Sequence, residues 1–261
     1  AIAKELGNFG YESGNLNLGC PSGTVVAKHR GAGFLAGPEK LDQFLEEIFA
    51  ECPLRISVKT RVGVNDAGEW EHLLSIYEKY PMEELIIHPR VQKDFYNNTP
   101  DMEAFLYAVE NSRHTLCYNG DICSVEDYRT WRQQMEEKRE CAFMQESGHQ
   151  TDPEDTGSLV SHLMLGRGVL KNPGLIRELT GHAPITKDQL HAFHDDVLKG
   201  YLDVMSGERN TLFRMKELWF YFAKYFTEPE KYVKQINKTQ HVAEYRVIVD
   251  NLFREQEWEH K

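Results

Sequence analysis

One cysteine stands where a predicted strand ends and could supply a thiol for proton transfer. Cys20 lies in the run LNLGCP at residues 16–21, in which Gly19 and Pro21 both interrupt a strand. The loop that follows is rich in glycine and basic residues, including Lys28, His29 and Arg30. A thiol is mostly protonated at neutral pH and can act as a general acid. The competing interpretation is a cysteine that packs as a small apolar side chain beside an ordinary turn.

Two pairs of cationic side chains stand near the ends of the next two predicted strands. Lys59 and Arg61 lie in RISVKTRV, and His88 and Arg90 lie in LIIHPR. Side chains two positions apart on a strand point to the same face, so the members of each pair project together. Buried cations need polar or anionic partners. An anionic ligand would supply them, and so would carboxylates inside the protein.

Glycine-containing turns end the last two predicted strands. Asn119, Gly120 and Asp121 form the first turn, and Gly166 and Arg167 belong to the second. Small residues at such turns let backbone N–H groups approach a phosphate, and the carboxyl end of barrel strands often holds one. The two turns predict a phosphate-binding edge.

Strands and helices alternate along the first 182 residues. Strands are expected at Leu16–Cys20, Arg55–Val62, Leu85–Arg90, Thr115–Ile122 and Ser161–Arg167, and helices near residues 38–51, 69–80, 101–111, 124–137 and 172–179. The segment Cys141–Leu159 is polar and is expected to be a loop. This alternation is typical of a parallel sheet covered by helices, and polar strand ends predict a TIM barrel. Five strands cannot close a barrel that needs eight. The expected barrel therefore lacks its first three βα units, about 90 residues at roughly 30 per unit, ahead of Ala1.

The pattern changes to helices alone after residue 182. The sequence predicts a partial barrel at residues 1–182 and a small helical bundle at 183–261, whose first helix Thr186 begins. Residues 199–240 carry eight basic and five acidic side chains, although the whole chain has a net charge of −11. Such a segment suits contact with a polyanion, and a solvated helix surface explains it as well. If RNA is bound, Arg214, Lys216 and Lys224 are the expected phosphate partners.

The composition is that of an ordinary globular protein. The chain has 261 residues, of which 41% are hydrophobic and 27% charged. No apolar run of 18 residues and no signal-peptide pattern is present, so the sequence predicts neither a membrane span nor secretion. The five cysteines form no CxxC pair, which argues against structural zinc or disulfides and predicts a cytoplasmic location. The acidic balance argues against a general nucleic-acid binder.

Taken together, the motifs LNLGCP, SVKTRVG, IIHPR, YNGDI and LMLGRG resemble those of the flavin-dependent tRNA-dihydrouridine synthases. The resemblance covers Ala1 to about Leu179, and RMKELWFYF at Arg214–Phe222 is similar to the family's C-terminal helical domain. It implies an FMN-bearing barrel that reduces the C5–C6 double bond of a uridine in tRNA, with NADPH as reductant. It also implies a tRNA-binding role for residues 183–261.

The resemblance also implies roles for individual residues. Cys20 matches the position that protonates the substrate, and Asn17 the position that contacts the uracil. The flavin-binding set is matched by Lys59, Arg61, His88, Arg90, Asn119, Gly120, Asp121, Gly166 and Arg167. Arg214 and Lys216 are expected to contact the tRNA, no metal is expected, and the protein is expected to be a monomer. Two alternatives stay open: an FMN oxidoreductase of the dihydroorotate-dehydrogenase kind, and a non-catalytic tRNA-binding protein.

Overall fold

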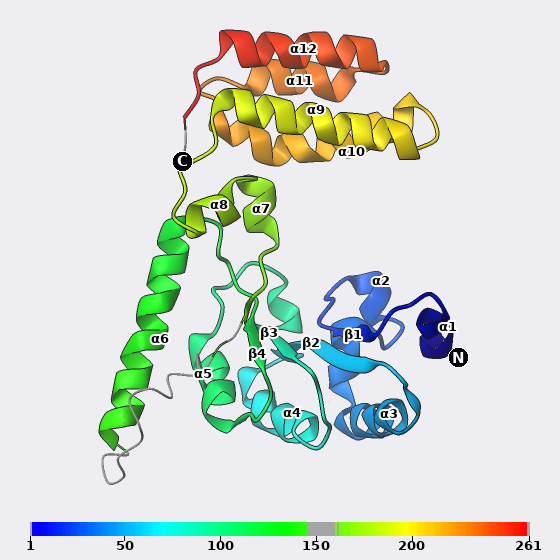
Figure 1. Cartoon of the computed structure of the whole chain (residues 1–261), viewed down its shortest axis with the longest axis vertical. Coiled ribbons are helices and arrows are strands. Elements are labelled where there is room, and N and C mark those ends of the chain that lie inside the picture. The colour runs from blue at the N-terminus through cyan, green and yellow to red at the C-terminus, as the bar shows by residue number, and fades with distance from the viewer. Residues whose placement is uncertain (1, 146–159, 161, 260–261) are drawn as a thin grey trace. The chain divides into compact units, whose positions relative to one another are not determined.

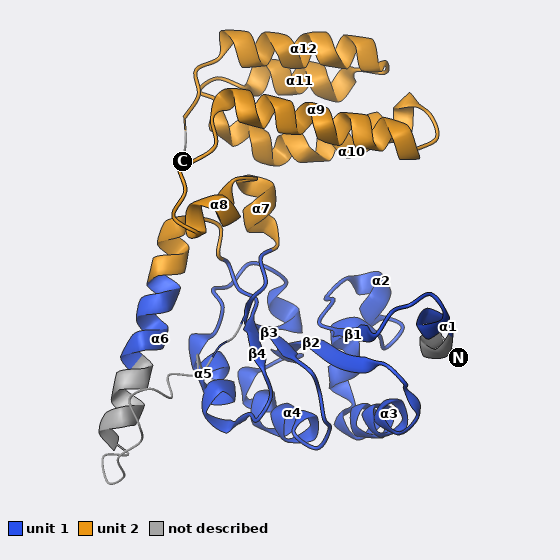
Figure 2. Ribbon diagram, in the orientation of Figure 1, with its two compact units in different colours: residues 1–121, 130–165 blue, residues 122–129, 166–261 orange. Residues whose placement is uncertain are grey.

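The structure is a computed structural model that describes residues 2–145, 160 and 162–259 (Figure 1). It divides into two compact units (Figure 2): residues 1–121 and 130–165 form the first, and residues 122–129 and 166–261 the second. This division lies before the boundary at residue 182 that the sequence predicts. The segment after residue 165 groups with the C-terminal helices, because α7 (Arg167–Lys171) contacts α10 (Glu208–Phe222).

The first unit is built on a parallel sheet of five strands in the order β1-β2-β3-β4-β5. The strands are β1 (Ser13–Leu18), β2 (Arg55–Gly63), β3 (Leu85–Val91), β4 (Leu116–Tyr118) and β5 (His162–Leu163). Each strand pairs in parallel with the next strand in the sequence. Parallel neighbours require crossover connections, and this sequential order is the one found in (β/α)8 barrels. The predicted α/β class is confirmed.

Helices connect these strands and cover one face of the sheet. They are α2 (Gly23–Val26), the 3-10 helix η1 (Gly31–Ala36), α3 (Pro38–Glu51), α4 (Trp70–Tyr77), α5 (Met102–Asn111) and α6 (Val125–Gln145), whereas α1 (Ile2–Asn8) precedes β1. Pro38 begins α3, as expected of a proline at a first helical position. Thr60 of β2 lies 2.9 Å from the hydroxyl of Tyr77 on α4, and both side chains are buried. The helix-covered face of β2 therefore carries Thr60, and the alternate residues point to the opposite face.

Several stretches differ from the sequence prediction. The strand expected at Thr115–Ile122 is shorter, because β4 covers only Leu116–Tyr118. Helical turns α2 and η1 form in the glycine-rich segment after Pro21, because tertiary contacts override the low helix propensity of glycine. β5 has only two residues, and Arg167, expected in that strand, begins α7. The helix α6 continues to Gln145 and includes the first residues of the expected loop Cys141–Leu159. Residues 146–159 of that loop lie outside the described part of the chain.

The second unit consists of helices packed around an aromatic core. After α7 come α8 (Leu175–Leu179), α9 (Lys187–Val204), α10, the 3-10 helix η4 (Ala223–Tyr225), α11 (Glu230–Lys238) and α12 (Val242–Glu255). Thr186 caps α9, and its hydroxyl accepts from the backbone N–H of Gln189. Trp219, Phe222 and Phe253 are buried in the core. Among the described residues, no helix has the length and apolar character needed to cross a membrane.

A chain of hydrogen bonds crosses this apolar core. The indole N–H of Trp219 donates to the Tyr245 hydroxyl at 2.7 Å, and this hydroxyl lies 2.6 Å from Nε2 of His194. Nδ1 of His194 lies 3.0 Å from a carboxylate oxygen of Asp195. Because a carboxylate can only accept, Nδ1 carries the proton and Nε2 accepts from Tyr245. Burial lowers the pKa of His194 from 6.5 to about 4, which is consistent with a neutral ring.

The buried histidine makes stability depend on pH. The unfolded chain binds a proton at His194 below about pH 6.5, whereas the folded protein resists it down to about pH 4. We expect the free energy of unfolding measured in urea to be highest above this window and to fall across it, by roughly 1.4 kcal/mol per pH unit. A His194→Phe variant should lose stability at neutral pH and fall less between pH 7 and 5. An equal decline in both proteins would contradict this assignment.

Candidate active site

The register of the sheet places the predicted site residues on one face. Asn17 of β1 pairs with Lys59 of β2, Lys59 with Ile86 of β3, and Ile86 with Cys117 of β4. Residues paired in register between parallel strands carry side chains on the same face, and so do residues two positions along each strand. The same face thus also carries four more predicted residues: Arg61, His88, Arg90 and Asn119. It is opposite to the face of Thr60, which packs on α4.

Arg61 is fully buried at the end of β2 and binds backbone carbonyls from two loops. Its Nε donates to Gly19 at 3.0 Å, Nη1 to Val91 at 2.8 Å and Nη2 to Phe95 at 2.7 Å. Burial lowers the pKa of Arg61, yet guanidinium groups stay protonated in proteins. Arg61 therefore ties the loop after β1 to the loop after β3.

The loop that carries Cys20 is fixed by hydrogen bonds on both sides of the cysteine. The Gly19 N–H donates to Oδ1 of Asn17 at 3.1 Å, and the Cys20 carbonyl accepts from the Ala32 N–H at 3.0 Å. Gly31, at φ +54°, passes so close that an added Cβ would lie 2.7 Å from the Cys20 carbonyl oxygen. The half-buried cysteine is thus held by its backbone. Asn17 supports this loop, and its amide N–H groups donate to no acceptor among the described residues.

His88 and Arg90 belong to a second buried network. Arg90 forms a bidentate ion pair with Asp121, with Nη1 3.0 Å from Oδ1. The same Nη1 lies 3.0 Å from Nε2 of His88. Arginine can only donate, so Nε2 accepts and Nδ1 of His88 carries the proton. Burial, with the charges of Arg61, Lys59 and Arg90, lowers the pKa of His88 to about 3. This neutral ring therefore offers one N–H to a ligand.

Lys59 is the cation on this face whose charge can change near neutral pH. Burial, followed by repulsion from Arg61, lowers its pKa from 10.5 to about 8. The neighbouring thiol of Cys117 stays protonated because burial raises its pKa to about 12. Within the described residues, no carboxylate forms an ion pair with Lys59. A partly buried ammonium without an acidic partner suits an anionic ligand.

Asn119 and Gly120 shape the turn after β4. The Asn119 amide donates to the Met164 carbonyl at 2.7 Å and so links the end of β4 to the chain after β5. A Cβ on Gly120 would lie 2.0 Å from the hydroxyl oxygen of Tyr118. The Tyr118 ring packs edge-on against Phe105 at 4.9 Å and cannot easily move away. Gly120 is therefore required by close packing.

One aromatic residue near these groups was not among the predicted site residues. The ring of Tyr96 lies 6.0 Å from the His88 ring and 5.5 Å from the Arg61 guanidinium carbon, and half of Tyr96 is exposed. Phe95, just before it, has φ +51° and gives its carbonyl to Arg61. The only sequence signal is an aromatic pair a few residues beyond a strand end.

The remaining predicted residues lie in the second unit. Gly166 precedes α7, and Arg167 is its first residue. Arg214 is exposed on α10 and lies 3.2 Å from Glu217. Lys216 donates to the Thr239 carbonyl at 2.7 Å and so connects α10 to the end of α11. In the part of the chain that the structure describes, no three His, Cys, Asp or Glu side chains form a candidate metal site.

A parallel α/β sheet whose polar face carries these side chains is typical of a barrel-type enzyme, and comparison with known proteins gives the family. The model of the dihydrouridine synthase family matches residues 1–257. A protein of Staphylococcus aureus strain Mu50 named probable tRNA-dihydrouridine synthase is 25% identical, over 94% of this chain and 69% of its own length. A similarly named protein of Staphylococcus epidermidis strain RP62A is 31% identical over 45% of this chain and 37% of its own. A tRNA-dihydrouridine(20/20a) synthase of Vibrio vulnificus is 26% identical over 51% of this chain and 45% of its own.

The chain belongs to the dihydrouridine synthase family. The resemblance that the five motifs indicate is therefore confirmed, and with it the assignment to the flavin-dependent oxidoreductases that act on tRNA uridines. The match covers the second unit as well as the sheet. The roles of individual residues are not fixed by this match and stay predictions.

The buried Arg61 gives a test of how the site is held together. An Arg61→Met variant keeps a similar side-chain length but leaves three carbonyls without their donor. We expect the free energy of unfolding to fall by about 3 kcal/mol, within the cost of several unsatisfied buried acceptors. Alkylation of Cys20, followed by mass spectrometry, should become faster because its loop is released. If the variant had wild-type stability and Cys20 were alkylated at the wild-type rate, Arg61 would not be what holds the two loops together.

Proposed function

We propose that this protein converts a uridine of tRNA to dihydrouridine by reducing its C5–C6 double bond, with FMN as the flavin and NADPH as the reductant. The observation that carries the proposal is the polar face of the sheet, on which Asn17, Lys59 and His88 lie beside the Cys20 loop. This face occurs in a chain that the family model matches over nearly its whole length.

The residues of this face fit a flavin. Lys59 is a partly buried cation without a carboxylate partner among the described residues, and His88 presents an N–H from a neutral ring. The polar edge of a flavin ring accepts hydrogen bonds and becomes anionic on reduction, so a cation and an N–H donor complement it. Arg90 and Asp121 hold His88 in place through their ion pair. Gly166 and Arg167 are proposed as phosphate contacts on the family resemblance.

The flavin, when bound, supplies the hydride that reaches C6 of the uracil. The chain's own residues supply the proton and the orientation. The thiol of Cys20 donates its proton to C5, so the double bond gains one hydride and one proton. The hydrogen bonds on both sides of Cys20 fix the backbone from which its side chain reaches the substrate. Asn17 carries amide N–H groups that can donate to a uracil carbonyl, and the Tyr96 ring offers an aromatic surface near His88.

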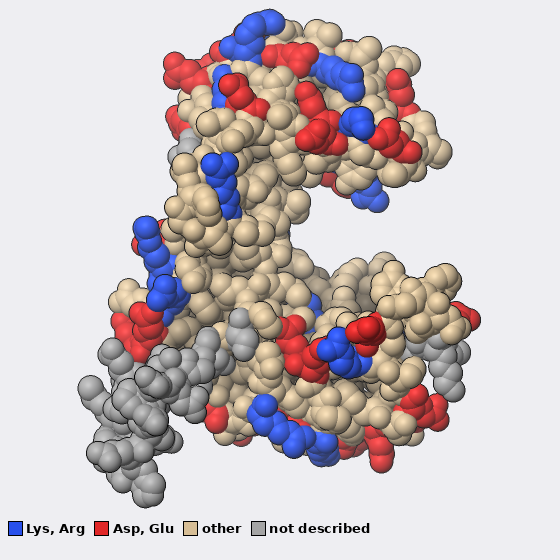
Figure 3. All heavy atoms as spheres, viewed as in Figure 1, with Lys and Arg blue, Asp and Glu red and all other residues tan. Residues whose placement is uncertain are grey.

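We propose that the second unit contacts the tRNA backbone. Figure 3 shows basic and acidic side chains interspersed over the visible surface of this unit, so contacts with single phosphates are favoured over a broad positive field. Arg214 and Lys224 are exposed there. Lys216 already donates to a carbonyl, and we assign it a smaller share of the contact. A monomeric state and a cytoplasmic location remain proposals.

Replacement of Cys20 tests the reaction. A Cys20→Ala variant should retain the flavin and its reduction by NADPH but form dihydrouridine about 10²–10⁴-fold more slowly, because a positioned general acid is lost. Single-turnover formation of dihydrouridine in tRNA is the measurement. Cys52→Ala is the matched control, since Cys52 is also half-buried but follows α3. An undiminished rate in Cys20→Ala would remove this thiol from the mechanism.

The lowered pKa of Lys59 predicts how flavin binding depends on pH. Lys59 carries its charge below about pH 8 and loses it as the pH rises through this value. Removing a cation from a charge-assisted contact should weaken FMN binding on the order of tenfold. Flavin fluorescence quenching between pH 6.5 and 9.5 measures this affinity. A Lys59→Met variant should bind weakly throughout, with a flatter profile. Equal pH dependence in both proteins would show that another group is responsible.

A further inference from the structure

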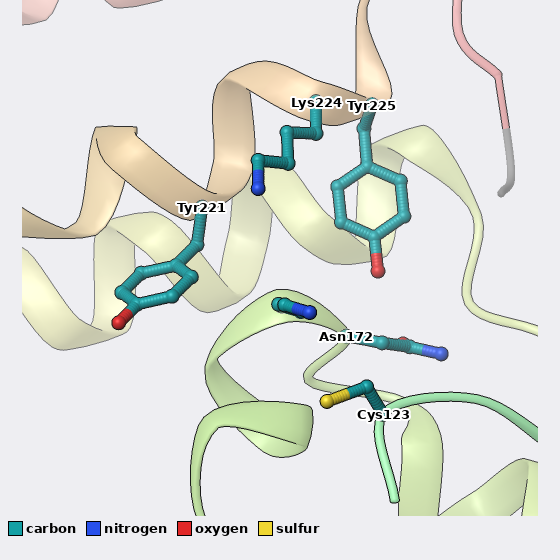
Figure 4. A pocket seen from close by; sticks show the side chains of 6 residues that line it. Cys123, Asn172, Tyr221, Lys224 and Tyr225 are labelled. Carbon is teal, nitrogen blue, oxygen red and sulfur yellow. The ribbon is translucent and has the colours of Figure 1, made fainter. Parts of the chain in front are cut away.

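A pocket of about 220 Å³ lies within the second unit, and none of its lining residues is assigned a part in catalysis. Its lining residues are Cys123, Lys171, Asn172, Tyr221, Lys224 and Tyr225. Figure 4 shows Tyr221, Lys224 and Tyr225, from the end of α10 and from η4, facing Asn172 and Cys123 across the pocket. The proposed function uses Lys224 only as a surface cation and leaves this cavity unexplained.

Two ammonium groups make the pocket suitable for an anion. Lys171 ends α7, and Lys224 lies on η4. Neither forms an ion pair with the side chains that the structure describes. The floor is rigid, because Asn172 donates to Glu178 at 2.7 Å and accepts from the Gly174 N–H at 2.8 Å. The carboxylate beside this floor, Glu178, is hydrogen-bonded to Asn172, and neither lysine is ion-paired with it.

Aromatic rings form the other part of the lining. Tyr225 is buried, and its ring stacks on Trp258 with centroids 4.7 Å apart and planes 8° apart. Tyr221 is only partly buried, so its ring is the one that a ligand can reach. Proteins that bind single-stranded nucleic acid combine aromatic rings with ammonium groups. The bases stack on the rings, and the phosphates contact the cations.

The size of the pocket restricts the ligand further. Pockets for drug-sized ligands measure roughly 300–1,000 Å³, and this one, at about 220 Å³, is smaller. It suits one nucleotide, and a whole dinucleotide such as NADPH exceeds it. The cation–π contact of Lys224 with Phe220, at 5.2 Å, does not neutralise the ammonium.

We propose that this pocket binds one nucleotide of the tRNA other than the uridine that is reduced. Its base lies on Tyr221, and its phosphate lies between Lys171 and Lys224. The inference rests on the proposed function for its choice of RNA as the ligand. It adds an anchoring point within the helical unit that is separate from the reaction.

Cys123 gives a native probe of this pocket. The half-buried thiol lines the cavity, so a bound nucleotide should cover it. We expect saturating bulk tRNA to slow alkylation of Cys123 by N-ethylmaleimide at least fivefold, measured by mass spectrometry. Alkylation of Cys52, a half-buried thiol of the first unit, should be unaffected. An unchanged Cys123 rate would overturn the proposal, and so would equal protection by NADPH alone.

Substitutions in the pocket test the same proposal through affinity. Lys171→Gln, Lys224→Gln and Tyr221→Ala should each weaken tRNA binding about tenfold, whereas Tyr221→Phe should retain it. Each lost cation should also reduce the slope of log affinity against log salt by about 0.7. Lys234→Gln is the matched control, because Lys234 is exposed on α11 and does not line the pocket. Pocket variants that match this control would overturn the proposal.

The two proposals fail in different ways. Protection of Cys123 and the affinities are measured without turnover, so they do not depend on the reaction. If tRNA protects Cys123 but no dihydrouridine forms, the proposed function is wrong and the pocket assignment stands. If dihydrouridine forms while Cys123 stays unprotected, the pocket assignment alone is wrong.

Discussion

The site depends on the hydrogen bonds that the buried guanidinium of Arg61 donates to backbone carbonyls. The guanidinium binds Gly19 on one side and Val91 and Phe95 on the other. A carbonyl carries only a partial charge, so these bonds satisfy the donors without cancelling the cation. The remaining positive charge is a cause of the lowered pKa values of both Lys59 and His88. One side chain thus sets the geometry of two loops and adds to the effect of burial on the pKa values of two neighbours.

A buried histidine has a structural role in the second unit and a proposed ligand-binding role in the first. In the helical core, the hydrogen bonds of His194 are satisfied by Tyr245 and Asp195, and no donor is left for a ligand. On the sheet, His88 has one ring nitrogen bound by Arg90 and the other available. Both histidines are neutral for the same reason, which is burial. What distinguishes them is the unused N–H of His88.

Much of the fold could be predicted from local sequence signals. Pro38 and Thr186 mark helix starts because their preferences are set by the backbone itself. The short β5 and the early start of α7 at Arg167 could not be predicted, because they depend on packing between distant segments. In the same way, the helical turns after Pro21 exist through contacts that glycine-rich sequence does not reveal.

For the site, strand alternation was enough to place Lys59 with Arg61, and His88 with Arg90, since the period of two is a property of any strand. That both pairs share one face follows from the register of β2 and β3, which the sequence does not reveal. The partners of Arg61 could not be predicted, because backbone carbonyls of loops leave no mark in the sequence. Tyr96 was missed for a related reason. Its position over Arg61 follows from the backbone of Phe95, at φ +51°, which an aromatic residue rarely adopts.

The sequential order of the strands has a consequence for how the first unit is made. Each strand from β2 to β5 pairs with the described strand translated just before it. A strand leaving the ribosome therefore meets a partner that is already present, and sheet growth need not wait for a distant segment. Each added strand covers the exposed edge of its predecessor, so the growing edge of the sheet is always the most recently synthesised strand.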